Sequence, residues 1–239
     1  MATVLHLSDT HLMVESTMTE HGDPDVSLLA TIDAVRDLHP DLVLLTGDIS
    51  DDGSEPALRR VNDLIVGLSA PVLALAGNHD DGNHVRMVFG SADTVEVGAW
   101  RVLAVESSVP GEIHGSVDVD ELVARLDRLD DRPTLIAIHH PPLSPSTHPW
   151  FQLLGAEKFL AALGARPHVR AVVSGHLHEA FERRSGDLSV FSGPSSWYAI
   201  EHNGDDFRWN DDGLVGSQIL TLGDDGAFSC ERVARSLGC

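Results

Sequence analysis

Seven side chains that are typical metal ligands follow five short apolar runs of the chain. In chain order they are Asp9, His11, Asp48, Asn78, His139, His176 and His178. Imidazole and carboxylate ligands without cysteine favour manganese, iron, zinc or cobalt over a thiolate site, and they leave the native metal open. Seven ligands are too many for one tetrahedral ion, but they suit two ions about 3.5–4 Å apart that share one carboxylate. The sequence therefore predicts a two-metal centre.

The spacing inside two of these groups supports a shared ion. Asp9 and His11 lie two positions apart, as do His176 and His178. In an extended backbone, side chains two apart point to the same side and are roughly 6–7 Å apart along the chain. Glycine directly precedes three of the ligands, at positions 47, 77 and 175, and it suits tight turns where the backbone must approach an ion.

Apolar runs and helical patterns alternate over the first two thirds of the chain. The runs are rich in Val, Leu and Ile without clean alternation, which predicts strands buried on both faces. They cover residues 3–7, 41–46, 71–76, 100–105, 134–138 and 168–173. Apolar residues at three-to-four spacing predict helices over 29–38, 54–68, 118–129 and 156–163. Such alternation indicates a largely parallel sheet, whose strand carboxyl ends form one ligand-binding rim.

The last third of the chain has no long helical pattern. Strands are predicted over 181–184, 188–191, 214–220 and 228–233, as an antiparallel meander that forms a second sheet. We therefore expect an α/β fold, a four-layer α/β/β/α sandwich of two mixed sheets flanked by helices. Residues 1–239 are expected to form a single domain, in which 179–239 contributes mainly antiparallel strands of the second sheet.

Five motifs resemble those of the calcineurin-like metallophosphoesterase superfamily. In the family's order they are Asp9-Thr10-His11, Gly47-Asp48-Ile49-Ser50-Asp51, Gly77-Asn78-His79-Asp80, His139-His140-Pro141 and Gly175-His176-Leu177-His178. Each motif alone is weak, but together they are highly specific. Within the superfamily the chain most resembles bacterial class III cyclic-nucleotide phosphodiesterases, through residues 44–52, 109–111, 114–115 and 139–142. The resemblance implies the metallophosphoesterase fold and a metal-dependent phosphoric diester hydrolase.

The resemblance also implies a role for each motif residue. One ion would be held by Asp9, His11 and His178 and the other by Asn78, His139 and His176, with Asp48 bridging both. His79 would be catalytic, stabilising charge on the phosphate or protonating the leaving oxygen, and Asp80 would orient it. Asn78 and His79 would contact the substrate, and His114 is a further candidate for substrate binding.

The implied reaction is hydrolysis of a small phosphodiester. A hydroxide that bridges two divalent or trivalent ions would attack phosphorus in line with the leaving group. The favoured substrate is a 3′,5′-cyclic nucleotide, cyclic AMP, which would give the nucleoside 5′-monophosphate. A glycerophosphodiester phosphodiesterase and a phosphomonoesterase stay open as alternatives. A non-catalytic scaffold is disfavoured because the full ligand set and His79 are present.

Several neighbours of the motifs have structural interpretations. His139 and His140 point to opposite sides of an extended segment, so one is expected to be a ligand and the other structural, and the motif selects His139. Asp51 is expected to support the turn at Asp48 or a ligand beside it. The proline-rich loop 141–150 is either a wall of the substrate pocket or a plain surface loop. Acidic pairs at 205–206 and 211–212 are interpreted as turn residues.

The charge balance is acidic, with 16 Lys and Arg against 37 Asp and Glu and a net charge of −21. This disfavours a polymeric nucleic acid, which needs cationic side chains along its phosphates, but not a small phosphodiester beside bound cations. No apolar run predicts a membrane span, and no signal peptide is recognised. Both cysteines, Cys230 and Cys239, lie near the C-terminal end, and a cytoplasmic location is expected. A homodimer is left open.

Overall fold

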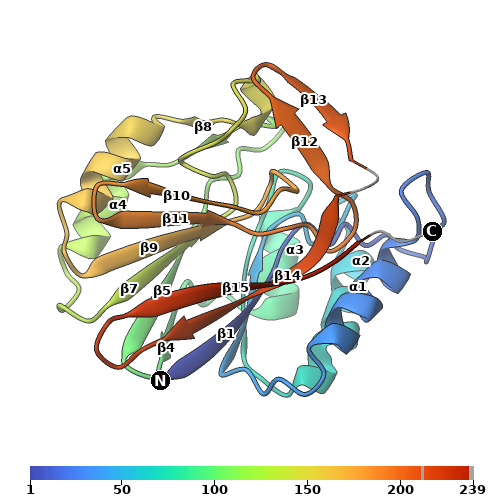
Figure 1. Ribbon diagram of the computed structural model, residues 1–239, viewed down its shortest axis with the longest axis horizontal. Helices are drawn as coiled ribbons and strands as arrows, with labels where there is room; N and C mark the ends of the chain where they lie inside the picture. Colours follow the sequence, from blue (N-terminus) through green and yellow to red (C-terminus); the bar gives the residue numbers. More distant parts are fainter. Residues whose placement is uncertain (211–212, 237–239) are drawn as a thin grey trace.

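The computed structural model describes residues 1–210 and 213–236, in which two mixed sheets pack face to face. One sheet has five strands in the order β15-β14-β1-β2-β3, and the other has six in the order β10-β11-β9-β7-β5-β4. Helices cover the outer face of each sheet, which gives the predicted α/β/β/α layers (Figure 1). The turn predicted at Asp211-Asp212 lies outside the described residues, as does Cys239.

The five-stranded sheet is parallel at its centre. β1 (Ala2–Leu7), β2 (Leu42–Thr46) and β3 (Val72–Leu75) run parallel, and β14 (Leu214–Leu222) pairs antiparallel with both β1 and β15 (Phe228–Ser236). The outer face of this sheet is covered by α1 (Pro24–Ala34), α2 (Glu55–Ile65) and α3 (Gly82–Phe89). A 3-10 turn, η1 (Val66–Leu68), follows α2.

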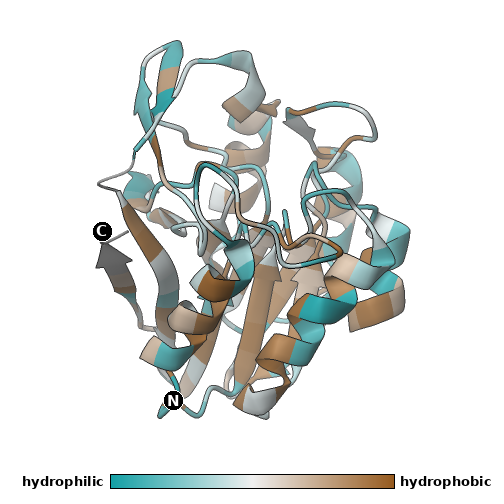
Figure 2. Ribbon diagram, turned by 90° about the vertical axis from the view of Figure 1, so that its right-hand side faces the viewer, coloured by the Kyte–Doolittle hydropathy of each residue, from teal (hydrophilic) through white to brown (hydrophobic). Residues whose placement is uncertain are grey.

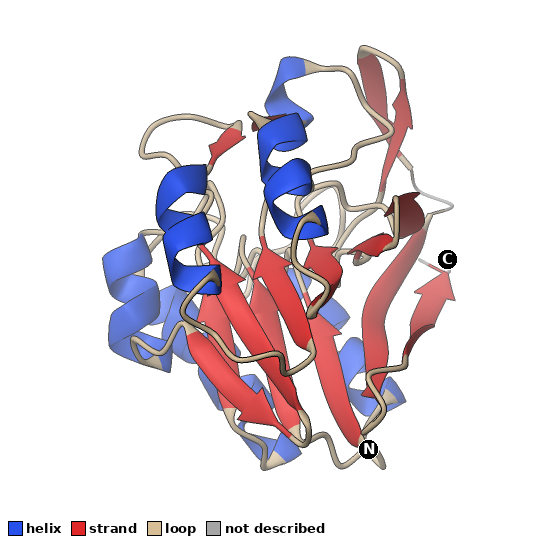
Figure 3. Ribbon diagram, turned by 90° about the vertical axis from the view of Figure 1, so that its left-hand side faces the viewer, coloured by secondary structure: helices blue, strands red, loops and turns tan. Residues whose placement is uncertain are grey.

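The six-stranded sheet also has a parallel centre. Its parallel strands are β5 (Trp100–Val105), β7 (Thr134–Ile138), β9 (Val169–Ser174) and β11 (Leu188–Ser192). The antiparallel edge strands are β4 (Thr94–Val97) and β10 (Phe181–Ser185). The helices α4 (Val119–Leu126) and α5 (Ala156–Gly164) cover its outer face, seen from that side in Figure 3.

Two short ribbons lie outside the main sheets. β6 (Gly115–Ser116) pairs with β8 (Leu153–Leu154), just after the 3-10 turn η2 (Pro149–Phe151). β12 (Ile200–Asn203) and β13 (Asp206–Trp209) form an antiparallel hairpin that projects from the top of the molecule in Figure 1.

The central strands are buried on both faces, which confirms the interpretation of the apolar runs. On β1, Val4 points into the core between the sheets, whereas Leu5 and Leu7 pack under the helices α1 and α2. In Figure 2 these strands are largely brown and lie behind helices that are part teal and part brown. All six predicted strands of the first two thirds are present, each within one residue of its predicted ends.

The first helix begins earlier than predicted. It runs from Pro24 to Ala34 rather than over 29–38, because the Asp23 carboxylate caps it by accepting from the Asp25 N–H. Leu29, expected on the buried face, is 46% exposed, while Leu28 is buried. The other three predicted helices are present, with ends up to three residues shorter or one residue longer.

The C-terminal strands do not form the predicted meander in one sheet. β10 and β11 join the six-stranded sheet, and β14 and β15 join the five-stranded sheet. Each hairpin is antiparallel, but it completes a different sheet, since β11 pairs parallel with β9 and β14 pairs antiparallel with β1. Residues 179–236 therefore contribute to both sheets rather than to the second alone.

Some elements had no strong periodicity and were not predicted: α3, β4, β6, β8 and the β12–β13 hairpin. The start of α3 carries a local signal, because the Asp81 carboxylate accepts from the backbone N–H groups of Asn83 and His84. None of the helices within 1–210 and 213–236 has the length and apolar composition that a membrane crossing requires.

Candidate metal centre

The carboxyl ends of strands from both sheets meet at one rim. The five-stranded sheet carries Asp9, His11, Asp48 and Asn78, and the six-stranded sheet carries His139, His176 and His178. Backbone hydrogen bonds join the motif loops: the His11 N–H donates to the Asp48 carbonyl at 3.0 Å, and the Gly175 N–H donates to the His139 carbonyl at 3.1 Å. The structure therefore brings all seven predicted ligands together across the two sheets.

One group of potential ligands consists of Asp9, His11 and His178. All three are buried, and one ligand atom of each lies within 4.8 Å of the others. His178 Nε2 is 3.7 Å from Asp9 Oδ1, and His11 Nε2 is 3.7 Å from Asp48 Oδ2. The Asp9 carboxylate also accepts from the His176 N–H at 3.0 Å, which ties the end of β1 to the end of β9.

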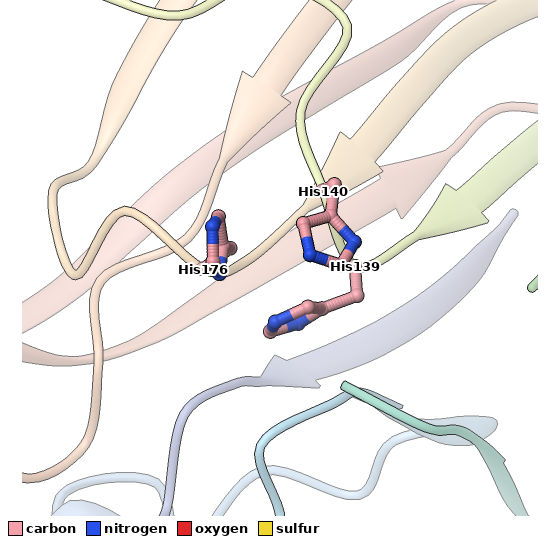
Figure 4. A group of neighbouring side chains, drawn as sticks. All are labelled: His139, His140 and His176. Atoms are coloured by element: carbon pink, nitrogen blue, oxygen red, sulfur yellow. The ribbon is translucent and has the colours of Figure 1, made fainter. Parts of the chain in front are cut away.

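A second group lies on the other side of Asp48. His139 Nε2 is 3.4 Å from Asp48 Oδ2 and 3.2 Å from Asn78 Oδ1. The rings of His176 and His139 lie side by side (Figure 4), and their centroids are 4.8 Å apart. One oxygen of Asp48 therefore faces imidazoles of both groups, which is the position of a bridging ligand.

Each of the four candidate ligand histidines has one ring nitrogen bonded to another part of the protein. These contacts are His11 Nδ1 to the Asp51 carboxylate (3.2 Å), His139 Nδ1 to the Thr46 carbonyl (2.7 Å), His176 Nε2 to the Trp150 carbonyl (2.9 Å) and His178 Nδ1 to the Tyr198 carbonyl (3.1 Å). An acceptor at one nitrogen fixes the tautomer and leaves a lone pair on the other nitrogen, which is how metal-binding imidazoles are oriented.

The geometry of the facing nitrogens of His11 and His178 indicates whether this group of side chains suits a cation. Their Nε2 atoms are 3.1 Å apart, and both Nδ1 atoms already donate outward. Two neutral rings in these tautomers would direct lone pairs at each other, which is favourable only with a proton shared between the two nitrogens or a cation bound by both. Asp9 and Asp48, at 0% and 2% exposed, add buried negative charge at the same place. The donor set therefore fits divalent cations.

Protonation in the metal-free chain follows the same charges. Burial holds the pKa of both His176 and His178 well below its usual range, so these rings stay neutral, as ligands must be. Burial would also lower the pKa of His139, but the Asp48 carboxylate raises it to about 9. Burial acts to raise the pKa of Asp48, yet His139 and His11 hold it well below its usual range. A proton on His139 thus supplies positive charge where a cation would bind.

The backbone at these ligands is unusual. Among the described residues, six non-glycine residues have positive φ, and five of them are candidate ligands: Asp9, His11, Asp48, His176 and His178. The left-handed region is sparsely populated by non-glycine residues, although Asp and His tolerate it better than most. Sharp turns at the strand ends therefore direct these side chains inward rather than along the strand.

Glycines of the motifs leave room for the ligands. A Cβ at Gly77 would overlap the Asp48 carboxylate, and a Cβ at Gly175 would overlap Ser8 and come close to Asp9. Only glycine allows such close approach of a backbone to a side chain. The predicted need for glycine at these positions therefore has a steric cause.

His79 lies at the edge of the centre and is not one of the buried ligands. Its side chain is 40% exposed, and its ring meets that of His11 edge-on at 4.7 Å. Its Nδ1 donates to the Asp51 carbonyl at 2.9 Å, and its backbone N–H donates to Asp48 at 2.9 Å. The ring is therefore anchored at Nδ1, and Asp51 contacts both His79 and His11.

The prediction that Asp80 orients the His79 ring is wrong. The buried Asp80 carboxylate accepts from the backbone N–H groups of Ile49, Ser50 and Gly77, at 2.9–3.0 Å. Asp80 therefore holds the turn after β2 against the turn after β3, and the Asp51 carbonyl is the group that orients His79. The predicted support of a ligand by Asp51 agrees with its contact to His11 Nδ1.

A cleft of about 760 Å³ opens beside His79. Asn78 and His79 are among the residues that line it, together with polar side chains such as Asn83, Arg86 and Glu106. His114 is not among the described residues that line this cleft, and its Nδ1 lies 3.6 Å from Glu112. Its suggested contact with substrate stays a prediction.

His140 uses both ring nitrogens inside the protein. Nδ1 lies 2.9 Å from the Ser107 hydroxyl, and Nε2 donates to the Ile113 carbonyl at 2.9 Å. Burial lowers the pKa of His140 to about 3, so it is neutral. With no free lone pair, His140 is a packing residue behind His139 and His176, which agrees with its structural interpretation (Figure 4).

Three residues that orient the ligands were not found in the sequence: Thr46, Trp150 and Tyr198. Each acts through its backbone carbonyl, so its residue type carries no signal. Only position gives a hint for Thr46, which directly precedes Gly47-Asp48. The loop 141–150 thus reaches the centre at Trp150, where it orients His176.

The sequence of the chain is similar to those of known proteins. A sequence profile of calcineurin-like phosphoesterases matches residues 2–180. A 3′,5′-cyclic adenosine monophosphate phosphodiesterase (CpdA) of Pseudomonas aeruginosa is 32% identical over 236 residues, which cover 93% of this chain and 86% of the relative. A probable glycerophosphodiester phosphodiesterase (GpdQ) of Arcobacter nitrofigilis is 28% identical, covering 73% of this chain and 71% of the relative.

Solved structures share the fold. A dimetal phosphatase from Danio rerio superposes with a TM-score of 0.70 and covers 92% of each chain at 13% sequence identity. At that identity the likeness shows the architecture alone, and it agrees with the predicted two-sheet sandwich.

Proposed function

This chain belongs to the calcineurin-like phosphoesterase family and is a metal-dependent phosphodiester hydrolase, and we propose that it opens a 3′,5′-cyclic nucleotide at a two-metal centre. The favoured substrate is cyclic AMP and the product is the nucleoside 5′-monophosphate. The observation that carries the two-metal part is the position of Asp48, whose Oδ2 faces His11 at 3.7 Å on one side and His139 at 3.4 Å on the other.

The proposed ligand sets follow from the two groups. Asp9, His11 and His178 would hold one ion, and Asn78, His139 and His176 the other, with Asp48 shared. Bound ions would supply a water of lowered pKa and neutralise charge on the phosphate. The contacts of Thr46, Trp150, Tyr198 and Asp51 keep the imidazoles in the ligand tautomer, since each accepts from the outward-facing nitrogen.

His79 would act on the substrate oxygens rather than on metal. Its Nδ1 is bonded to the Asp51 carbonyl, which leaves Nε2 as the nitrogen that can transfer a proton to the leaving oxygen or bond the phosphate. Its partial exposure, at 40%, and its place in the lining of the 760 Å³ cleft make it accessible to a small diester.

Replacing His79 by Gln should lower kcat by about 10²- to 10⁴-fold, because proton transfer by a positioned side chain contributes in that range. Metal content should be unchanged, since no proposed ligand is removed. The check is steady-state kinetics together with metal analysis by plasma mass spectrometry. His39→Gln, at an exposed histidine, is the matched control. A variant that loses metal along with activity would contradict the assignment of His79 outside the ligand set.

The substrate class rests on the relatives. The cyclic AMP phosphodiesterase relative covers more of the chain, at 32% identity, and supports the cyclic nucleotide. The probable glycerophosphodiester phosphodiesterase, at 28% identity, supports the second candidate. A polymeric nucleic acid is disfavoured by the 16 cationic side chains against 37 acidic ones. The predictions of a cytoplasmic location and of a homodimer stay predictions.

A substrate panel separates these candidates. Cyclic AMP, glycerophosphocholine and a phosphomonoester are offered to the manganese-loaded protein under identical conditions. We expect kcat/KM for cyclic AMP to exceed that for the other two by about tenfold or more, as one misfit group in a site costs at least that much. Rapid turnover of glycerophosphocholine with cyclic AMP untouched would replace the first candidate by the second. Preference for the monoester would reject both.

A further inference from the structure

Most of the few tryptophan and tyrosine residues of the chain lie near the candidate metal centre. The chain has four Trp and one Tyr. Trp100 is buried in the core, whereas Trp150, Trp197 and Tyr198 contact candidate ligands and Trp209 packs against Tyr198. The ring centroid of Tyr198 is 4.2 Å from that of His178, and the ring centroid of Trp197 is 5.7 Å from that of His11. Trp150 reaches His176 through its carbonyl oxygen at 2.9 Å.

Two of these rings, those of Tyr198 and Trp209, pack with the imidazole of His21 in one cluster, which we call the aromatic shelf. The ring centroids of Tyr198 and Trp209 are 5.1 Å apart, those of His21 and Tyr198 are 4.7 Å apart, and those of His21 and Trp209 are 4.8 Å apart. The three residues come from the loop before α1, from the segment after β11 and from the end of β13. They are far apart in sequence and meet only in the fold.

The shelf is attached to the metal centre, and its Trp209 end is open to solvent. Tyr198 orients His178 through its carbonyl, and the Asn210 N–H donates to the Ala199 carbonyl at 3.0 Å, which holds the end of β13 beside it. Trp197 is only 5% exposed and packs beneath, with its Nε1 donating to Gly22. Trp209, by contrast, is 47% exposed. A large ring left in water beside a buried polar site indicates a surface for a ligand.

We propose that the aromatic shelf stacks the base of the nucleotide substrate, an inference that rests on the proposed function. Aromatic side chains beside a phosphate-binding centre are suited to a π-faced group, and base–aromatic stacking tolerates any base. The cleft beside His79 is lined by polar side chains such as Asn83 and Arg86 together with Val109, and none of its described lining residues is Phe, Tyr or Trp. The shelf therefore determines preference for nucleotides over glycerophosphodiesters, whose alcohols have no aromatic ring.

Kinetics with two cyclic diesters tests this. One is cyclic AMP, and the other is methyl riboside 3′,5′-cyclic phosphate, which has the same reacting ring but no base. Trp209→Leu should lower kcat/KM for cyclic AMP about tenfold, mainly through KM, and change that for the base-free diester by less than about twofold. Trp209→Phe, which keeps a stacking ring, is the matched control and should stay within about threefold of the parent.

The outcomes distinguish a failure of the stacking proposal from a failure of the proposed function. If Trp209→Leu lowered kcat/KM equally for both diesters, or for neither, the proposed stacking role of the shelf would be wrong. Hydrolysis of cyclic AMP by the parent enzyme would still support the proposed function. Equal kcat/KM for cyclic AMP and the base-free diester in the parent enzyme would likewise show the stacking role to be wrong. A parent enzyme that does not hydrolyse cyclic AMP would overturn both the proposed function and the shelf.

Discussion

Asp48→Asn is expected to reduce phosphodiester hydrolysis by about a thousandfold or more. Asp48 Oδ2 is the one oxygen that faces both His11 and His139. An amide NH₂ in its place would direct N–H groups at the positions where cations and neutral imidazoles require an acceptor. Both ions should therefore bind more weakly, and metal content should fall along with activity.

The substitution is conservative in shape, which makes the result interpretable. The amide oxygen can still accept from the His79 N–H, as Asp48 Oδ1 does at 2.9 Å. Kinetics, metal analysis and circular dichroism together distinguish loss of metal from loss of fold. Asp63→Asn, at an exposed position of α2, removes the same charge far from the ligands and should leave kcat unchanged. An Asp48→Asn protein that keeps two ions and full turnover would reject the shared-ligand assignment.

Removing the metal should lower the thermal stability strongly and abolish activity. Without cations, the buried carboxylates of Asp9 and Asp48 and the facing nitrogens of His11 and His178 lack full compensation. Ligands that bind only the folded state stabilise it by about 2.7 kcal/mol per site at a hundredfold excess over Kd. Two such sites correspond to a rise in Tm of about 10–20 °C for a chain of this size.

The measurement is a melting curve of chelator-treated protein during manganese titration, with activity followed in parallel. Tm and turnover should rise over the same range of manganese concentration. In Asp48→Asn the rise in Tm should be less than about half of the parent value, since both sites lose their shared ligand. A parent Tm that does not respond to manganese would show that the rim does not bind it.

The gathering of the candidate ligands at one rim could be predicted from the residue types that follow each predicted strand. Asp9, His11 and Asp48 follow apolar runs that had to be strands, and parallel strands bring their carboxyl ends to one rim. The selection of His139 over His140 also followed from the motif, and the contacts of His140 agree with it. Local pattern and spacing are sufficient when a side chain itself performs the chemistry.

Contacts made by the backbone or across the two sheets could not be predicted. The carbonyl groups of Trp150 and Tyr198 orient His176 and His178 whatever their side chains are. Asp80 follows His79 directly in sequence, but its side chain points to the turn at Ile49, since neighbours in a tight turn diverge. The C-terminal strands have the same pattern in either sheet, and only packing decides that β14 joins β1.

The left-handed backbone at five candidate ligands implies that activity would come at the expense of the stability of the metal-free chain. Each such residue costs about 1 kcal/mol relative to ordinary geometry, so five together are comparable to the whole free energy of unfolding of a small domain. Glycine would relieve this strain but remove the ligand. The metal-free fold is therefore held below its attainable stability at the place where the ligands gather, and a descendant that abandoned catalysis could become more stable by changing these five positions first.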